Sequence, residues 1–572
     1  MMRLSLLSSG WQGRSAFRSA DEKLAIWLAC AAAALMLIFI AAPLLTMFGM
    51  TIQASDGSFA GLDNWVSLLA EPRLRAATWN SIALALVTTA IVLPLALAFA
   101  FALTRSRIMG GKIFRLIALI PMLAPSFMPA ISLVYLFGNQ GLLKSWLGDT
   151  SIYGPVGIIL GEVFYTFPHA TLILTAALAV SDKRLYEAAE CLGASKLRRF
   201  LTVTLPNARH GVVSSAMVVF TMVVTDFGIP KVIGGQINVL SLEAYKQVIG
   251  QQNFNKGAVI GVLLLLPAVL SFIVERWVAQ RRSAQIDGRS VLYHAHPNKL
   301  RDGLLWLLCA GVSVFLLSLL GVGVFAAFVK MWPYDMHLTL AHFDFNDLDG
   351  GGWLAFTNSL KMSLLVTVFG TTAIFLSAYL TEKLPVPKGI SSMIHRLALL
   401  PMAVPGLVLG LGYVLFLNSP RNPLHMLYGS MSLLVLATIA HFYTTAHLTI
   451  TTSLRQLNGE IEAVARSLQQ SWWRTCLRVT LPICSPAVLD VARYLFISSM
   501  TTVSCVIFLY TPDTVLASIS ILNMDDAGDT AAAAAMATMI VLSSLVVSLV
   551  MTLAGWWLNQ RHQGWRQTSR QG

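Results

Sequence analysis

Long apolar runs, separated by short polar segments, make up most of this sequence. An apolar run of about 20 residues crosses a bilayer as a helix, because lipid offers no hydrogen-bond partner to an open backbone. The sequence contains twelve such runs, so it predicts an all-α polytopic membrane protein. The runs are 24–48, 80–103, 113–137, 155–180, 210–232, 257–279, 303–329, 358–380, 393–417, 430–453, 486–510 and 531–558.

The charge content agrees with a membrane protein and excludes other classes. Only 12% of the residues are charged, whereas a soluble protein carries about 25%. This value excludes a soluble enzyme, a disordered scaffold and a secreted disulfide protein. The six cysteines form no CxxC pair, so neither a metal site nor a disulfide framework is predicted. We interpret the net charge of +13 as an orientation signal, not as a sign of nucleic-acid binding.

The basic residues predict the orientation in the membrane. With the N-terminus inside, 31 of the 40 Lys and Arg residues fall in segments on the cytoplasmic side, where such residues accumulate. Both termini are therefore expected in the cytoplasm. The segments expected outside carry acidic residues instead, namely Asp344, Asp347, Asp349, Asp525, Asp526 and Asp529.

The two halves of the chain repeat each other. Asn80-Ser81 returns as Asn358-Ser359, and the Phe-Tyr-Thr that precedes His169 returns before His447. A parallel repeat of this kind indicates a pseudo-two-fold axis along the membrane normal, with a pathway between the halves. The predicted units are a first six-helix half at 1–279, a cytoplasmic linker at 280–302 and a second six-helix half at 303–572.

The segment between the fourth and fifth runs carries a motif. It reads Glu187-Ala188-Ala189, then Gly193, then Leu205-Pro206. Residues 184–192 predict a short helix with small side chains on one face, and Gly193 supplies the left-handed residue that ends it. Pro206 marks the entry to the next helix. The segment predicts a cytoplasmic helical knob of the kind that fits a groove in a partner protein.

The second half carries a degenerate copy of the motif. When the copies are aligned on Leu481-Pro482, Ala463 replaces the glutamate, Ala465 is one of the small pair, and Glu462 lies one position early. Gln469 takes the place of the glycine. We therefore expect the second knob to have a different turn, to couple more weakly, and to tolerate substitution of Gln469.

The spacing Glu-Ala-Ala, three residues, Gly, eleven residues, Leu-Pro resembles the coupling motif of ABC importer permeases of the binding-protein-dependent type. The resemblance covers almost the whole chain. It implies two copies of a separate cytoplasmic ATPase that dock on the knobs, a periplasmic substrate-binding protein, and a multi-pass location in the bacterial inner membrane. The coupling residues that it implies are Glu187, Ala188, Ala189, Gly193, Leu205, Pro206, Glu462, Ala463, Ala465, Leu481 and Pro482.

The sequence offers no site for ATP of its own. A phosphate-binding loop needs GxxxxGK followed by Ser or Thr. The nearest candidate, Gly110-Gly111-Lys112, is followed by Ile113 and has Ser106 where the first glycine belongs. We therefore predict a transport subunit that is not an enzyme, has no catalytic residue or bound cofactor, and relies on ATP hydrolysis by its partner.

Ionisable residues inside membrane spans are functional candidates. Asp226 lies beside a Gly-Ile-Pro helix breaker, and its repeat counterpart is Thr502. Three roles are open for it: contact with a cationic part of the substrate, a part in the outer gate, or a structural cap on the broken helix. His169 and His447 lie at matched positions, which favours shared packing or hydrogen bonding, with substrate contact as the alternative.

The substrate is predicted by resemblance alone. Residues 225–259 look most like permeases for 2-aminoethylphosphonate, and fused permeases for ferric iron or thiamine are the alternatives. Asp226 and Lys231 are compatible with the ammonium and phosphonate groups of the first candidate, provided that the helix breaks at Pro230. A secondary transporter is the rival class, but it needs ion-coupling carboxylates near the midplane, and Asp226 is the nearest candidate.

Overall fold

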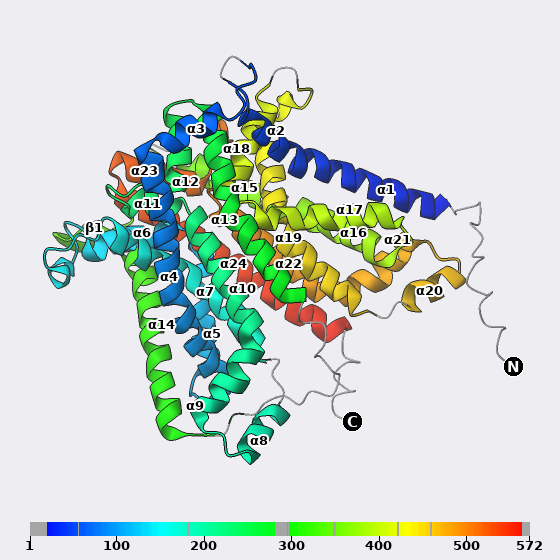
Figure 1. The fold of residues 1–572 in the computed structure, drawn as a ribbon, viewed down its shortest axis with the longest axis horizontal. Coiled ribbons are helices and arrows are strands. Elements are labelled where there is room, and N and C mark those ends of the chain that lie inside the picture. Colours follow the sequence, from blue (N-terminus) through cyan, green and yellow to red (C-terminus); the bar gives the residue numbers. More distant parts are fainter. Residues whose placement is uncertain are drawn as a thin grey trace.

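The computed structural model describes residues 20–562 apart from 55–56, 180–182, 281–294, 296, 347–350, 420–421 and 458–459. The described chain is almost entirely helical (Figure 1). Most of the predicted linker, together with Asp347 and Asp349, lies outside the described residues.

The first half contains thirteen α-helices in its described part. Short 3-10 or π-helical turns join several of them. The helices are α1 (Ala20–Met36), α2 (Ala42–Met50), α3 (Asp63–Ala70), α4 (Pro72–Arg105), α5 (Gly111–Leu119), α6 (Phe127–Phe137), α7 (Pro155–Ala179), α8 (Lys183–Cys191), α9 (Lys196–Arg199), α10 (Leu205–Thr225), α11 (Gly228–Ile233), α12 (Leu240–Tyr245) and α13 (Phe254–Gln280).

The second half follows the same order and adds one antiparallel hairpin near its start. Its elements are α14 (Lys299–Phe328), β1 (Val329–Met331), β2 (Asp335–Leu338), α15 (Gly352–Leu365), α16 (Thr371–Lys383), α17 (Lys388–Leu399), α18 (Gly406–Leu417), α19 (Met431–Arg455), α20 (Glu460–Ser467), α21 (Trp472–Thr475), α22 (Leu481–Thr501), α23 (Ala517–Ala527) and α24 (Thr530–His562).

The predicted membrane helices are confirmed, with two of them sharply bent. Among the described residues, ten helices are long and apolar enough to cross a membrane, and two bent pairs bring the number to twelve. The pair α5/α6 bends by 101° and the pair α17/α18 by 113°. Each bend lies at the second proline of a pair, Pro121 and Pro125 in the first half and Pro401 and Pro405 in the second. The residue before that second proline is extended, with ψ of 142° at Ala124 and 115° at Val404. Proline disfavours a helical conformation at the residue before it.

Two other predicted helices are broken. The run 210–232 divides at Asp226, and the run 486–510 ends its helix at Thr501. Asp226 and its counterpart Thr502 are both extended, with ψ of 136° and 139°. The carbonyl of each residue accepts a hydrogen bond from a serine hydroxyl, at 2.5 Å from Ser241 and 2.6 Å from Ser518. The break is therefore a repeated feature of both halves.

The first helix of each half packs on the other half. Helices α1 and α2 contact α17 and α18, whereas α14 contacts α4, α5 and α6. The indole N–H of Trp472 donates to the carbonyl of Asp21 at 3.0 Å, and the hydroxyl of Tyr413 donates to the carbonyl of Phe39. This exchange of peripheral helices ties the two halves into one body.

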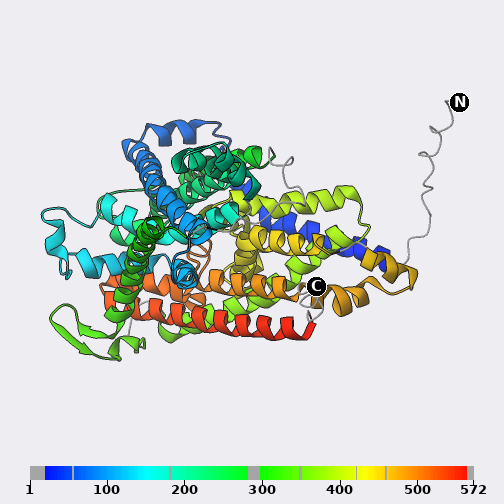
Figure 2. The ribbon, with the colours of Figure 1, turned by 90° about the horizontal axis from the view of Figure 1, so that it is seen from below.

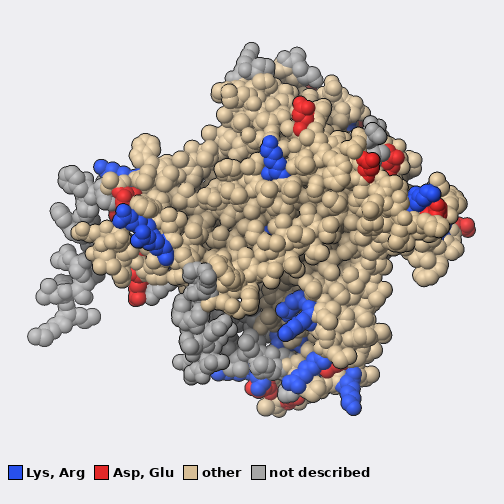
Figure 3. Space-filling view, turned by 180° about the vertical axis from the view of Figure 1, so that it is seen from behind, with Lys and Arg blue, Asp and Glu red and all other residues tan. Residues whose placement is uncertain are grey.

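The two knobs lie at the ends of two diverging arms. Helices α8 and α20 occupy separate corners of the molecule, while α3 and α23 lie toward the opposite end (Figure 1). In the view from below, the segment that contains α20 lies beside α1, the first-half helix that crosses to the second half (Figure 2). Figure 3 shows a surface hollowed between the arms and a broad middle that carries few charged side chains.

Candidate functional site

The first knob is built on α8 and turns one buried side chain inward. Tyr186 is the buried residue of this helix, whereas Glu187, Ala188 and Gly193 are exposed. Lys183 pairs with Glu187 at 2.7 Å, one helical turn away. The motif residues therefore form the outer face of the knob, where a partner protein can reach them.

Both knobs end their first helix with the same turn. Gly193 has a φ of +69°, and Gln469 has a φ of +53°. The amide of Ala194 donates to Ala189 at 3.0 Å, and that of Gln470 donates to Ala465 at 2.9 Å, which is the bond that closes a Schellman turn. The expectation of a different turn in the second knob is therefore wrong. The backbone bonds hold Gln469 in a conformation that glycine adopts at lower cost.

The second knob, like the first, exposes one face of its helix and buries one side chain. On α20, Ala463 is exposed and Ala465 is half-buried, but Glu462 is buried. Glu462 therefore turns away from the surface that a partner would touch, unlike Glu187. The Leu-Pro pairs open the following core helices in both halves, as Leu205 and Pro206 of α10 and Leu481 and Pro482 of α22.

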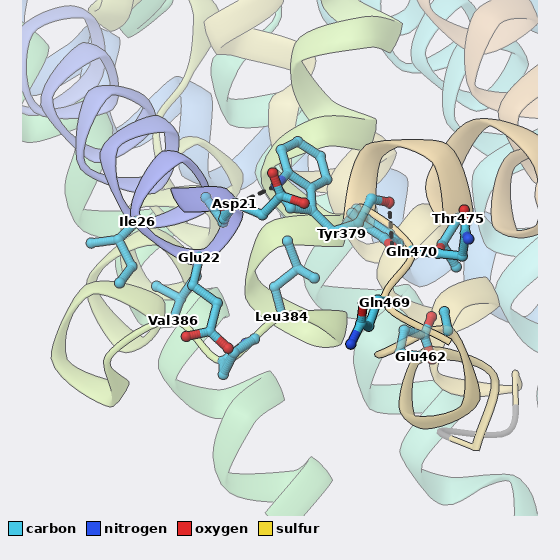
Figure 4. Close-up of a pocket in the computed structure, with 14 residues that line it drawn as sticks. Asp21, Glu22, Ile26, Tyr379, Leu384, Val386, Glu462, Gln469, Gln470 and Thr475 are labelled. Carbon is cyan, nitrogen blue, oxygen red and sulfur yellow. Dashed lines mark hydrogen bonds between the residues drawn. The ribbon is translucent and has the colours of Figure 1, made fainter. Parts of the chain in front are cut away.

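A cavity of about 420 Å³ lies beside the second knob. The first turn of α1 and the turn at Gln469 face each other across it (Figure 4). No sequence pattern predicts this cavity, because it depends on α1 crossing to the second half. Its polar lining includes Asp21, Glu22, Glu462, Gln469 and Gln470.

Asp226 lies at the break between α10 and α11 and caps the second of these helices. The backbone N–H of Ile229 donates to its carboxylate at 2.9 Å. The carboxyl group of Glu162, on α7, lies next to that of Asp226. Glu162 is fully buried, and no hydrogen bond of normal geometry reaches its carboxyl oxygens within the described structure. Glu162 is not predicted from the sequence, because its repeat counterpart is Ala440 and no motif shared by the two halves marks it.

Lys231 does not face Asp226. Its ammonium pairs with Asp526 of α23 at 2.9 Å, and this ion pair joins the two halves at the end opposite the knobs. The rings of Tyr245 and Phe508 stack across the same interface at 6.3 Å. Burial raises the pKa of the neighbouring Asp525 to about 6, and the charge of Asp526 adds to this shift. The halves therefore meet at this end while their knobs lie apart.

The two matched histidines share their packing. The ring centroids of His169 and Tyr165 lie 6.2 Å apart, and those of His447 and Tyr443 lie 5.6 Å apart. His447 is buried, whereas His169 is partly exposed. In the part of the chain that is described, no group of three or more His, Cys, Asp or Glu side chains is placed to hold a metal ion.

Comparison with known proteins identifies the same family in both halves of the chain. The model of the binding-protein-dependent transport system inner membrane component matches residues 93–284 and again residues 373–561. The ferric transport system permease protein FbpB of Actinobacillus pleuropneumoniae is 26% identical over 77% of this chain, and the match spans 65% of that relative, less than two thirds of its length.

Two further similarities cover different shares of the chain. The Fe(3+)-transport system permease protein FbpB 2 of Haemophilus influenzae is 25% identical over 89% of this chain and 96% of its own length. Among solved structures, a bacterial ABC transporter involved in the import of the acidic polysaccharide alginate has 17% identity and a TM-score of 0.39. That match covers 46% of this chain and 97% of the other.

Proposed function

This chain belongs to the family of binding-protein-dependent transport system inner membrane components, which are ABC importer permeases, and on that premise we propose that it imports ferric iron. A separate cytoplasmic ATPase, in two copies, docks on the two knobs and supplies the energy. A periplasmic binding protein delivers the iron at the opposite end. The observation that carries this proposal is the family match in both halves, each with a knob between its core helices.

Two lines of support favour ferric iron over 2-aminoethylphosphonate. Both relatives described above are named for ferric iron, and the phosphonate assignment has no comparable support. In addition, Lys231 is engaged by Asp526 at 2.9 Å and does not join Asp226 around one zwitterionic ligand. Thiamine, the remaining alternative, also lacks a supporting relative among those described.

The proposed pathway passes Asp226 and Glu162. These two carboxyl groups lie together inside the membrane domain, where ionisable side chains are costly and mark ion or substrate pathways. Carboxylate oxygens are hard ligands, which suit a highly charged metal cation better than a phosphonate anion. His169, one turn beyond Tyr165 on the same helix as Glu162, is the next candidate along this path.

The proposed transport cycle starts from a state that is closed at the outer end. In this state the halves meet through Lys231 and Asp526, and the knobs stand on separate arms. ATP binding by the docked ATPases brings the knobs together. If the halves pivot against each other, this closure opens the outer end and separates the Lys231–Asp526 pair. The proposed cycle is therefore a switch between two packed arrangements of the halves, one closed and one open at the outer end.

The proposal is tested by uptake of labelled ferric iron in bacterial cells that contain the ATPase and the binding protein. Cells with this chain should accumulate iron, and cells without it should not. A hydrolysis-defective ATPase serves as the control and should abolish uptake. Labelled 2-aminoethylphosphonate and thiamine are measured in parallel. Uptake of either one in place of iron would overturn the substrate assignment. Iron uptake that persists with the defective ATPase would favour an ion-coupled secondary transporter.

A further inference from the structure

Two buried cations occupy matched places in the two halves. Arg105 is the last residue of α4, and Lys383 is the last residue of α16. They lie 278 residues apart, the same spacing that separates Asn80 from Asn358. Arg105 is 3% exposed, and the Lys383 side chain is 7% exposed. Because a buried charge is costly unless it is paired and hydrogen-bonded, the partners of both cations are informative.

In the first half, Arg105 joins the knob to the core helices. Its guanidinium donates to the carbonyl of Leu178, at the end of α7, at 2.5 Å. It also lies over the ring of Tyr186, 5.1 Å from the centroid. Tyr186 is the inward residue of α8, and its hydroxyl donates to Thr204 at 2.9 Å, immediately before α10. One cation therefore holds together the ends of α4 and α7 and the root of the knob.

The second half makes the same junction with different chemistry. The Lys383 ammonium donates to the carbonyl of Leu457, just beyond the end of α19, at 3.0 Å. It also forms an ion pair at 3.8 Å with Glu462, the inward residue of α20. Glu462 lies 276 residues after Tyr186, which is also the spacing between Gly193 and Gln469. A cation–π contact in one half thus corresponds to an ion pair in the other.

We propose that Arg105 and Lys383 are positioning residues that make each knob move with the core helices of its half. This inference rests on the proposed function, in which an ATPase moves the knobs. A knob that is tied to the ends of the second and fourth core helices passes its movement into the membrane domain. A knob that has lost this tie can follow the ATPase alone. We call the contacts of Arg105 with Tyr186 and of Lys383 with Glu462 the anchors of the two knobs. Glu462 is then not a displaced copy of Glu187 but the partner of Lys383 in the second anchor.

The proposal predicts a separation of transport from ATP hydrolysis. The complex is purified with its ATPase, placed in liposomes, and supplied with iron-loaded binding protein. Arg105→Met and Lys383→Met should each increase the ATP hydrolysed per iron ion transported, on the order of tenfold, a typical size for coupling between sites. The ATPase should still copurify, because the exposed face of each knob is unchanged. A purely structural role would instead lower the amount of complex and leave this ratio unaltered.

Two further sets of variants keep the test decisive. Arg455→Met is the matched control. Arg455 ends α19 and pairs at 2.7 Å with Glu382, which precedes Lys383 on α16, but its side chain is 61% exposed and this ion pair does not involve the knob. It should leave the ratio unchanged. In the first half, Tyr186→Leu should uncouple transport, whereas Tyr186→Glu should preserve coupling because a carboxylate there can pair with Arg105 as Glu462 pairs with Lys383.

The outcomes distinguish this inference from the proposed function. Equal ratios of ATP to iron in wild type, Tyr186→Leu and Tyr186→Glu would overturn the anchor proposal even if Arg105→Met fails to accumulate. A wild-type chain that neither binds the ATPase nor needs ATP would instead overturn the proposed function. A high ratio in Tyr186→Leu, restored in Tyr186→Glu, supports the anchors.

Discussion

Replacing Gly193, which ends the helix of the first knob, by alanine should weaken docking of the ATPase. Gly193 and Gln469 both have positive φ, a conformation that costs an L residue about 1–2 kcal/mol. A Cβ atom at Gly193 would meet nothing within 4 Å, so Gly193→Ala should cost this conformational energy alone. A loss of 1–2 kcal/mol lowers the population of the intact turn by about 5- to 30-fold. Gln469→Gly should relieve the strain and strengthen the second knob.

Proline distinguishes the backbone argument from a side-chain contact. Gly193→Pro should abolish docking, because proline fixes φ near −65° and the amide of Gly193 donates to Glu190 at 2.9 Å. Gln469→Pro should abolish docking at the second knob, because its φ of +53° is closed to proline. Gln469 therefore accepts glycine but not proline, in contrast to the general tolerance that the degenerate motif suggests.

The assay is the affinity of the purified ATPase for the chain in detergent, with iron uptake as a second readout. We expect Gln469→Gly to bind the ATPase with an affinity equal to or above that of the wild type. Gly193→Ala should bind with lower affinity, and the two proline variants should not bind. Part of the gain from Gln469→Gly is offset by the greater freedom of glycine in the unfolded turn. The reasoning is refuted if Gly193→Ala is as harmful as Gly193→Pro, or if Gln469→Gly weakens docking.

Three further predictions follow from the site. Glu187→Lys should abolish transport and ATPase docking, because it reverses the charge of the exposed knob face; normal docking would show that this face is not the contact. Asp226→Asn should impair iron uptake without reducing the protein level in membranes, and unchanged uptake would remove Asp226 from the pathway. Lys231→Met should raise ATP hydrolysis in the absence of binding protein by up to about fivefold, because losing a partly exposed ion pair costs about 0.2–1 kcal/mol. Exchanging the charges of Lys231 and Asp526 should restore the wild-type rate, and a rate that stays high in the exchanged variant would argue against this outer contact.

Local sequence signals were sufficient for the helices and the repeat. The apolar runs are long enough that length alone predicts the spans. The prolines at both bends, Pro125 and Pro405, occupy matched positions in the two halves of the sequence. The size of the bends was not predictable, because a proline restricts the backbone only locally, here at Ala124 and Val404. The turn of the first knob was predictable from Gly193, since few residues other than glycine adopt positive φ at low cost.

Contacts between distant segments left no such signal. The crossing of α1 to the second half depends on which apolar surface it meets, and apolar runs look alike in sequence. Gln469 adopts the glycine conformation because backbone bonds enforce it, which a residue-by-residue comparison does not reveal. The anchors at Arg105 and Lys383 were hidden for a related reason. Their partners, an aromatic ring and a carboxylate, perform one task with different residue types, so no shared motif marks them.

The most direct test of the account is ATP-driven iron transport by purified components. Liposomes containing this chain and its ATPase receive ATP on the ATPase side and iron-loaded binding protein on the other side, and accumulated iron is measured against ATP consumed. We predict accumulation that requires the chain, the binding protein and hydrolysis together, and that stops in the Gly193→Pro variant. Iron that enters at the same rate without ATP, or hydrolysis that never leads to accumulation with all components intact, would contradict the account.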